Sequence, residues 1–594
     1  MEAARPRTDR RRPRRGSADR PIDTRLLRSV WIVLAIPILV LLATVSRTGP
    51  YPAPTVPPSF DRPNAVALTR DLALEHAERV PGSAGAEGAA QWFVDKISEY
   101  GLTVDEDTWT EDIPTLGKRT LRNLAVVIPG SQSDAILLVA HRDNSVGTAG
   151  ANDNASGTAA LVELARSFAT VGTGDAQPRR PLHTVILLST DAGAFGSLGA
   201  RRFAARSPLR DRVGAAIVLD GLAARGRPRL EVAGLGRTSP TQALVRTLTA
   251  RVESSVIVSV NRPSLVRQLV SLALPFGYGE QATLLEHGIP TVRLTTTPDA
   301  RARPGTDEVE DMNPLRLGQL GIAADETLSS LDAAVELPRT TSSQIFVGRR
   351  AVRGWAFELL LIATTIPFAA AALDLAGRCR RRRLSLLPAW RALRRRFLWW
   401  LGAGGVLLVA TVLGIFPSSR GVPPTPYDPP AGRWPAVTVV GVLIVIAVIW
   451  ASGRRPPHAR ATTSDERLAG WAVALLGLGL VSLVAMLVSP FLLIFVLPSL
   501  YAWLLVPHVP VTRGWLPDLL YGIGFAGPVA AVVTLALQFD LGLAAPTYAL
   551  QLMTSGTIPA MATLALLGWT AIAVHVGSLV SGSYTPVGPP SSRR

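Results

Sequence analysis

At 594 residues the chain is too long for one ordinary domain, and 48% of its residues are hydrophobic, with a mean hydropathy of +0.28. The formal net charge of +17 would suit nucleic-acid binding. However, arginines are concentrated at residues 5–15 and 378–396, and both segments lie beside apolar runs. This location indicates segments that stay on the cytoplasmic side of a membrane. The single cysteine, Cys379, excludes an internal disulfide and a cysteine-based zinc cluster, so any metal site must use His, Asp and Glu.

The first elements in chain order are a basic tail, an apolar run and a proline-rich segment. The apolar run at 30–45 is long for a signal-peptide core and lacks a convincing small-x-small cleavage site. We therefore expect an uncleaved membrane anchor at 29–46 behind a cytoplasmic tail at 1–28, with a cleaved signal peptide as the alternative. The prolines at 50–64 predict an extended spacer.

Strand-like and helix-like patterns then alternate through a domain at 65–345. The strand-like runs are 122–127, 135–140, 184–189 and 215–219, and the helix-like runs are 157–169, 198–205 and 240–252. This alternation predicts an α/β domain with a mainly parallel sheet. Ligands of such sheets bind at the carboxyl ends of the strands, in the loops that lead into helices.

After Arg353 long apolar runs dominate and predict an all-α polytopic transmembrane bundle at 354–580. About seven helices are expected, near 354–376, 397–416, 436–452, 468–488, 490–507, 515–538 and 559–580. With the amino terminus inside, the arginine-rich loop 378–396 and a tail at 581–594 also fall inside, and the domain falls outside. We therefore expect an integral protein of a bacterial-type plasma membrane, with an extracytoplasmic domain and both termini cytoplasmic.

Few charged side chains lie within the predicted spans. They are Glu358, Asp374, Asp518 and His575, mostly near the ends of spans. Charges near the ends usually reach the interface, so they give little sign of a transport path. A transporter or lipid-handling protein with a regulatory outer domain remains an alternative. Membrane lipid is an expected partner and nucleic acid is not.

The residues that carry chemistry follow the strands of the α/β domain. His141 leaves the strand at 135–140, with Asp143 placed to orient it, and Asp153 lies just before a helix. Asp220 directly follows the strand at 215–219. One His and two Asp at three strand ends would suit a divalent cation such as zinc. The alternatives are a polar loop for His141 and a favourable helix-dipole position for Asp153.

These residues resemble the di-zinc aminopeptidases of metallopeptidase family twenty-eight. The block Gly-Ala-Asn-Asp-Asn-Ala-Ser-Gly at 150–157 carries most of the resemblance, with Arg-Val-Pro-Gly-Ser at 79–83 and Gly-Ile-Pro at 288–290. The resemblance covers about 60–340. It implies a zinc-aminopeptidase-like three-layer sandwich with two adjacent zinc ions.

The resemblance assigns residues to the first zinc site. By position in the family motifs, His141, Asp153 and Asp220 would hold that zinc, and Asp143 would orient His141. All four residue types are present. The resemblance therefore implies that this half of the metal site is complete.

The second half of the family site is degenerate. The family carries a Glu-Glu pair before x-Gly-x-x-Gly, as general base and zinc ligand, but those positions hold Gly193 and Ala194. The family histidine upstream of Gly-Ile-Pro is replaced by Gln281. No confident catalytic base remains. The candidate substitutes are Asp191 as base and Glu280, Glu286 or His287 as a rebuilt ligand, although each also fits a surface or turn role; His183 looks structural.

These features predict at most one zinc per chain and an impaired zinc metallopeptidase. The favoured function is a degenerate peptidase that binds peptides or a protein partner. The alternative is an active single-zinc aminopeptidase or peptide hydrolase. Restoring the family groups with Gly193→Glu, Ala194→Glu and Gln281→His together is expected to raise zinc binding from about one to two.

Overall fold

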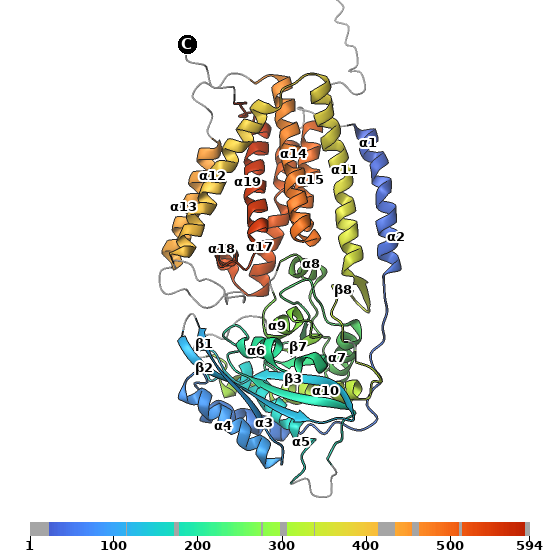
Figure 1. Cartoon of the computed structure of the whole chain (residues 1–594), viewed down its shortest axis with the longest axis vertical. Helices are drawn as coiled ribbons and strands as arrows, with labels where there is room; N and C mark the ends of the chain where they lie inside the picture. Colours follow the sequence, from blue (N-terminus) through green and yellow to red (C-terminus); the bar gives the residue numbers. More distant parts are fainter. Residues whose placement is uncertain are drawn as a thin grey trace, which may run out of the picture.

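The computed structural model describes residues 23–113, 116–171, 178–274, 277–296, 306–337, 339–413, 434–453, 462–509 and 514–587. The chain forms an α/β domain at one end of the molecule and a helical bundle at the other (Figure 1). The terminal tails predicted at 1–28 and 581–594 lie partly outside the described residues.

The α/β domain is built on a seven-stranded sheet of order β1-β2-β4-β3-β5-β7-β6. The strands are β1 Asp105–Ile113, β2 Gly117–Ile128, β3 Gln132–His141, β4 His183–Thr190, β5 Val213–Leu219, β6 Arg229–Glu231 and β7 Thr291–Thr295. The four central strands, β4, β3, β5 and β7, are parallel, whereas β1, β2 and β6 pair antiparallel at the two edges. The sheet is therefore parallel at its centre and mixed overall.

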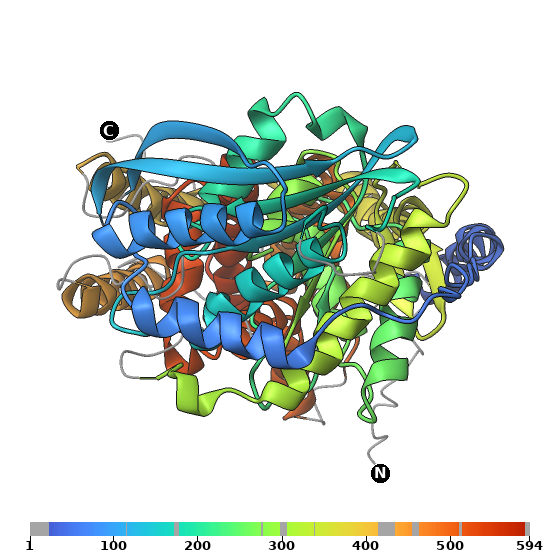
Figure 2. The same ribbon diagram turned by 90° about the horizontal axis from the view of Figure 1, so that it is seen from below.

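Helices cover both faces of the sheet, which gives the three layers (Figure 2). On one face lie α3 Arg62–Glu75, α4 Ala84–Glu99, α5 Gly157–Arg166, α7 Gln242–Ser255 and α10 Pro314–Asp332; on the other lie α6 Leu198–Arg206 and α9 Glu280–Glu286. Along β3, Ile136 and Leu138 face the first layer, and Leu137 and Val139 face the second. Continuous apolar runs such as that of β3 are typical of parallel strands covered on both sides.

The bundle contains more helices than the sequence indicated. They are α1 Thr24–Val30, α2 Ala35–Ala43, α11 Gly354–Arg381, α12 Leu387–Val412, α13 Trp434–Gly453, α14 Ser464–Val488, α15 Leu493–Leu505, α16 Leu516–Ile523, α17 Ala526–Gln538, α18 Ala545–Thr554 and α19 Ala560–Val580. Among the described residues, five helical segments are long and apolar enough to cross a membrane, or six if the bent pair α16–α17 is one span.

Three features of the bundle differ from the prediction. The arginine-rich segment predicted as a loop at 378–396 is mostly helical, because α12 already begins at Leu387; arginine favours helices, and Pro388 suits a first turn. The helix predicted at 515–538 is bent by 49° between α16 and α17. Near that bend, Gly524 lies against the Trp503 indole, where a Cβ would be 2.0 Å from Nε1. The third difference is α18, which the sequence did not indicate.

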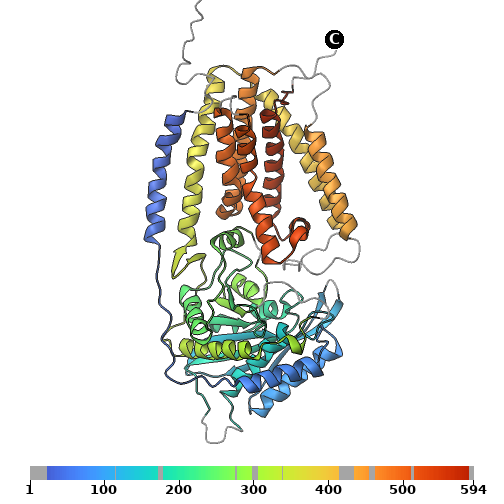
Figure 3. The same ribbon diagram turned by 180° about the vertical axis from the view of Figure 1, so that it is seen from behind.

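The domain meets the bundle through two connections (Figure 3). The hairpin β8 Gln344–Val347 and β9 Arg350–Arg353 leads into α11, and Ser46, just after α2, pairs with Ala351 of this hairpin. The second connection is α8 Leu265–Ala273, whose Val270 packs with Leu535 and Phe539 at the end of α17. The segments that leave α2 and enter α11 therefore run together on the side that carries the domain.

Candidate metal centre

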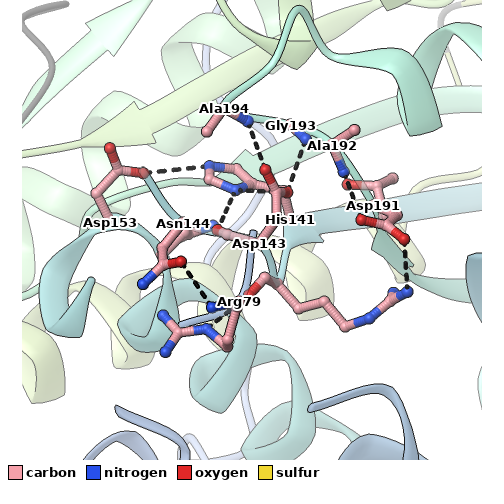
Figure 4. Close-up of polar contacts among 12 residues, drawn as sticks. Arg79, His141, Asp143, Asn144, Asp153, Asp191, Ala192, Gly193 and Ala194 are labelled. Atoms are coloured by element: carbon pink, nitrogen blue, oxygen red, sulfur yellow. Dashed lines mark hydrogen bonds and ion pairs between the residues drawn. The ribbon is translucent and has the colours of Figure 1, made fainter. Parts of the chain in front are cut away.

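Three predicted metal ligands converge at the carboxyl ends of neighbouring parallel strands. His141 ends β3, Asp153 lies in the turn just before α5, and Asp220 follows β5. His141 Nε2 lies 3.3 Å from Asp153 Oδ1 and 3.6 Å from Asp220 Oδ1, and the ligand atoms all lie within 4.8 Å of one another. Figure 4 shows Asp153 pointing at the imidazole.

This spacing fits a divalent metal ion. Four ligands placed tetrahedrally at zinc bond lengths are separated from one another by about 3.4 Å. Burial alone would lower the pKa of His141, but Asp143, Asp153 and Asp220 together raise it well above its ordinary value. A group of buried carboxylates around one imidazole therefore needs a positive charge, which either a metal ion or a protonated His141 can supply.

Asp143 holds His141 in place, as its position in the sequence suggested. His141 Nδ1 lies 3.1 Å from the Asp143 carbonyl oxygen and 3.3 Å from its carboxylate. That carboxylate accepts the backbone N–H groups of Gly193 at 2.7 Å and Ala194 at 3.0 Å (Figure 4). The turn after β4 thus orients the Asp143 carboxylate, and this carboxylate orients His141. A carboxylate beside a metal-binding imidazole commonly has this role.

The asparagines of the 150–157 block join the loop that carries Asp153 to the loop that carries Asp220. Asn152 Oδ1 accepts the Ala223 N–H at 2.7 Å. Asn154 donates to the Leu219 carbonyl at 2.9 Å and accepts the Gly221 N–H at 3.0 Å. Because side chains of the Asp153 loop satisfy buried backbone groups of the Asp220 loop, these bonds fix the separation of the two carboxylates.

Two residues that contact the predicted ligands escaped the sequence analysis. Asp307 accepts the backbone N–H groups of Asn152 at 2.7 Å and Asp153 at 2.9 Å, and burial, with the charge of Asp153, raises its pKa to about 7. Arg293, on the buried strand β7, donates to Asp220 Oδ2 at 2.9 Å. The one available signal for Arg293 was a charged side chain between the apolar Val292 and Leu294 of a short strand; nothing in the sequence near Asp307 marks it.

Arg293 lies beside the position where the family has its missing histidine. A Cβ on Gly279 would be 2.9 Å from Arg293 Nη1 and 2.7 Å from Gln281 Oε1. Burial alone would raise the pKa of Asp220, but His141 and Arg293 hold it well below its ordinary range. A fixed guanidinium therefore supplies positive charge on this side of the site.

The structure gives Asp191 a structural role rather than the suggested role of base. Its carboxylate accepts the backbone N–H group of Ala192 at 2.8 Å (Figure 4). It also accepts the Arg122 N–H at 3.1 Å and lies 3.5 Å from Arg142. These contacts hold the turn after β4 to β2. None of the hydrogen bonds and ion pairs described for this carboxylate involves His141.

Gly193 is packed against His141 itself. A Cβ at this position would lie 2.3 Å from both Cβ and Cγ of His141, so a glutamate cannot be accommodated while the histidine keeps its place. The expected benefit of Gly193→Glu within the triple substitution is therefore wrong for this backbone. The reason is steric exclusion by the first ligand and not a left-handed backbone conformation.

Among the other candidate substitutes, only Glu280 lies within the site. One carboxylate oxygen accepts the Thr190 hydroxyl, and the other is buried with no hydrogen-bond partner in the described part of the chain. Burial raises the pKa of Glu280 to about 7, against the lowering effect of a charged His141.

Glu286 and His287 are exposed, and His183 bonds to the Asp332 carbonyl as a structural residue.

Gln281 is directed away from a ligand role. Its amide nitrogen donates to the Tyr278 carbonyl at 2.6 Å, which ties the start of α9 to the segment that follows α8. The amide therefore serves the turn before α9, in the place where a second metal ion would need a histidine.

Comparison with known proteins supports the resemblance of the α/β domain to metallopeptidases. Residues 123–298 match the model of peptidase family M28. Leupeptin-inactivating enzyme 1 of Streptomyces exfoliatus is 26% identical over 164 residues, 27% of this chain and 35% of that protein. The probable glutamate carboxypeptidase AMP1 of Arabidopsis thaliana is 35% identical over 135 residues, 22% of this chain and 18% of that protein. The chain thus matches about a third or less of the length of these relatives.

Solved structures include similar α/β domains. An aminopeptidase from Aneurinibacillus sp. strain AM-1 is 13% identical and covers 49% of this chain and 97% of that one, with a TM-score of 0.37. A glutaminyl cyclase from an Acidobacteriales bacterium is 19% identical and covers 47% and 98%, with a TM-score of 0.38. On its matching family model and on the convergence of His141, Asp153 and Asp220 at the strand ends, the α/β domain of this chain is an M28-family metallopeptidase-like domain.

Proposed function

We propose that the chain is a membrane-anchored M28-type domain that binds one zinc ion and uses the site to bind peptides or a protein partner, with little hydrolysis. One observation carries the proposal. His141, Asp153 and Asp220 converge, while the three positions for a base and a second metal are occupied by Gly193, Ala194 and Gln281.

The chemistry of the site supports binding over turnover. A bound zinc ion would act as a Lewis acid toward a carbonyl oxygen or a free amino terminus. Hydrolysis also needs a carboxylate that accepts a proton from water, and loss of such a base typically costs about 10²–10⁴ in rate. Gly193 has no side chain, and the Asp191 carboxylate is held by Arg142 and by backbone N–H groups. The site can therefore bind a peptide through the zinc ion but lacks the base that efficient hydrolysis needs.

A single-zinc peptide hydrolase is the second candidate, and Glu280 favours it. Its unpartnered buried oxygen and its pKa of about 7 are properties of a general base that works near neutral pH. A charged His141 lowers the pKa of Glu280, and Thr190, the last residue of β4, donates a hydrogen bond to its carboxylate. In this reading Glu280 replaces the family base from a different element.

For the whole chain, we propose a plasma-membrane location with the domain outside and both termini inside. The arginine-rich end of α11 and start of α12, and the carboxyl-terminal end of α19, lie at the end of the bundle away from the domain (Figure 1). Positively charged segments concentrate on the cytoplasmic side of membrane proteins. This arrangement supports an extracytoplasmic domain.

One experiment separates the two candidates. The purified full-length chain, loaded with zinc, is mixed with short peptides that have free amino termini, and both binding and release of the first residue are measured. We expect zinc-dependent binding with release near background. Robust zinc-dependent release that disappears in Glu280→Gln would reject the binding role and establish the hydrolase.

A further inference from the structure

A groove of about 690 Å³ runs along the bundle between α12, α14 and α19. Its lining residues include Leu393 and Phe397 of α12, Gly477 and Val481 of α14, and Gly568 and Ile572 of α19. The two glycines allow close packing at its floor, where a Cβ on Gly568 would be 3.3 Å from Val481 Cγ2. The volume falls within the range of about 300–1,000 Å³ that is usual for small-molecule sites.

The groove opens toward the outside of the bundle rather than toward its core. Leu387 and Leu480, which both line it, are 54% and 57% exposed. The exposed Trp390 lies at the same edge. An apolar groove on the outer face of membrane helices is open to acyl chains, and a tryptophan at its rim is typical of the lipid interface.

Two cations line this apolar groove without a counter-charge. Arg391 and Arg394 belong to its lining, which includes no Asp or Glu. No ion pair joins either arginine to a carboxylate within the described part of the chain. The neighbouring helix shows the contrast: Arg378 and Arg381 at the end of α11 lie 2.5 and 3.7 Å from Asp374. The groove therefore offers positive charge to an anion at one end and apolar surface along its length.

We propose that this groove binds one anionic phospholipid. Its phosphodiester would lie against Arg391 and Arg394, and an acyl chain would lie along the apolar residues of α14 and α19. Guanidinium groups match phosphate oxygens in charge and geometry, and basic pockets between membrane helices are suited to anionic headgroups. Both arginines lie near the start of α12, at the end of the bundle away from the domain (Figures 1 and 3). The lipid therefore belongs to the leaflet opposite the domain.

The charge pattern favours a lipid over a transmembrane helix of another protein. An apolar helix in the groove would leave Arg391 and Arg394 near hydrocarbon without a counter-ion, which is costly in a membrane. A phospholipid supplies the anion and the apolar chain in one molecule. The proposal rests on the membrane placement of the bundle proposed above, but not on the metal centre.

The test measures lipid retained by the full-length chain after purification in mild detergent and exhaustive washing. Native mass spectrometry and headgroup analysis should show about one anionic phospholipid per wild-type chain. The double variant Arg391→Gln/Arg394→Gln should retain at least fivefold less. A control with the same charge change, Arg380→Gln/Arg383→Gln, lies outside the groove and should retain as much as the wild type.

A second variant tests the apolar part of the groove without changing charge. Gly568→Leu places a side chain on the floor and should also reduce lipid retention, while the protein stays monodisperse and keeps its zinc content. Equal retention by the wild type and Arg391→Gln/Arg394→Gln would overturn the proposal, as would equal preference for a zwitterionic lipid in nanodiscs of defined composition. Recovery of the chain in the soluble fraction without detergent would instead reject the membrane placement itself.

Discussion

Gly193, at the position where the resemblance places a family glutamate, is packed against the imidazole of His141. The Cβ of any other residue would lie 2.3 Å from the histidine Cβ and Cγ. We expect Gly193→Ala to destabilise the chain by about 1–3 kcal/mol, as is usual for overpacking, and to weaken metal binding because His141 must move.

Thermal unfolding of the purified chain and zinc titration check this expectation. The matched control is Gly236→Ala, at a glycine where an added Cβ meets nothing within 4 Å. Equal stability and equal zinc affinity of the two alanine variants would show that the turn after β4 adapts freely.

Glu280 gives the site a pH dependence that can be measured in metal-free protein. Burial raises its pKa from 4.5 to about 7, so the folded state disfavours the ionised carboxylate. The resulting loss of folding stability is absent below about pH 4.5, grows between about pH 4.5 and 7, and reaches its full value above about pH 7. Glu280→Gln removes the ionisation, keeps an acceptor for Thr190, and should stabilise the chain at pH 8 by up to about 3 kcal/mol.

The comparison needs unfolding curves of wild type and Glu280→Gln at pH 5 and pH 8, with a chelator present. The exposed Glu286→Gln is the control and should change stability at neither pH. A stabilisation by Glu280→Gln that is the same at both values would contradict a buried carboxyl that titrates near neutrality.

The sequence predicted the three converging side chains because each directly follows a strand or opens a helix, and parallel strands end at one edge of a sheet. It also located Asp143, through its position two residues after His141. It could not locate Arg293 or Asp307, which approach from β7 and from a loop more than a hundred residues away in the chain. Such contacts depend on tertiary packing and leave no local pattern.

At the scale of elements, α8 links the metallopeptidase-like domain to the bundle. Val270 packs with Leu535, and the Tyr278 ring lies edge-on to Phe539 with centroids 6.0 Å apart. Tyr278 also accepts the hydrogen bond from Gln281, so the same segment contacts both the bundle and the start of α9.

We expect Tyr278→Ala and Phe539→Ala to loosen this docking in a coupled way. A double-mutant cycle on chemical unfolding of the full-length chain should give a coupling energy of about 0.5–1.5 kcal/mol, typical of aromatic pairs. Leu543→Ala, at a fully exposed side chain of the bundle, is the control and should not couple to Tyr278→Ala. Strictly additive effects of the two aromatic substitutions would contradict the docking role of α8.

The strands and helices predicted in the domain agree with β2, β3, β4, β5, α5, α6 and α7. They could be predicted because the apolar residues of each element recur with the period at which its side chains are buried against the sheet. The antiparallel pairing at the two edges was not predicted, because β6 has only three residues and β1 is rich in acidic side chains. In the bundle, apolarity predicted helices near α11, α13, α14, α15 and α19, but it predicted neither the start of α12 at Leu387, nor α18, nor the 49° bend between α16 and α17.

For the whole molecule, the proposed orientation predicts which side of the membrane each connection between helices occupies. A fusion after Gly348, in the β8–β9 turn, should be active with a reporter that works only outside the cytoplasm. A fusion after Arg383, between α11 and α12, should be active only with a cytoplasmic reporter. Activity of the Gly348 fusion only in the cytoplasm would invert the proposed orientation.

The metal content of the purified full-length chain shows directly whether His141, Asp153 and Asp220 form a single zinc site. Elemental analysis at modest zinc concentration should find about one zinc ion per chain, held by the three ligands that suffice for an open site. Asp220→Asn should lose most of this zinc, whereas Asp211→Asn, at an exposed carboxylate, should keep it. Two zinc ions per chain, or unchanged zinc binding in Asp220→Asn, would contradict a single site built from His141, Asp153 and Asp220.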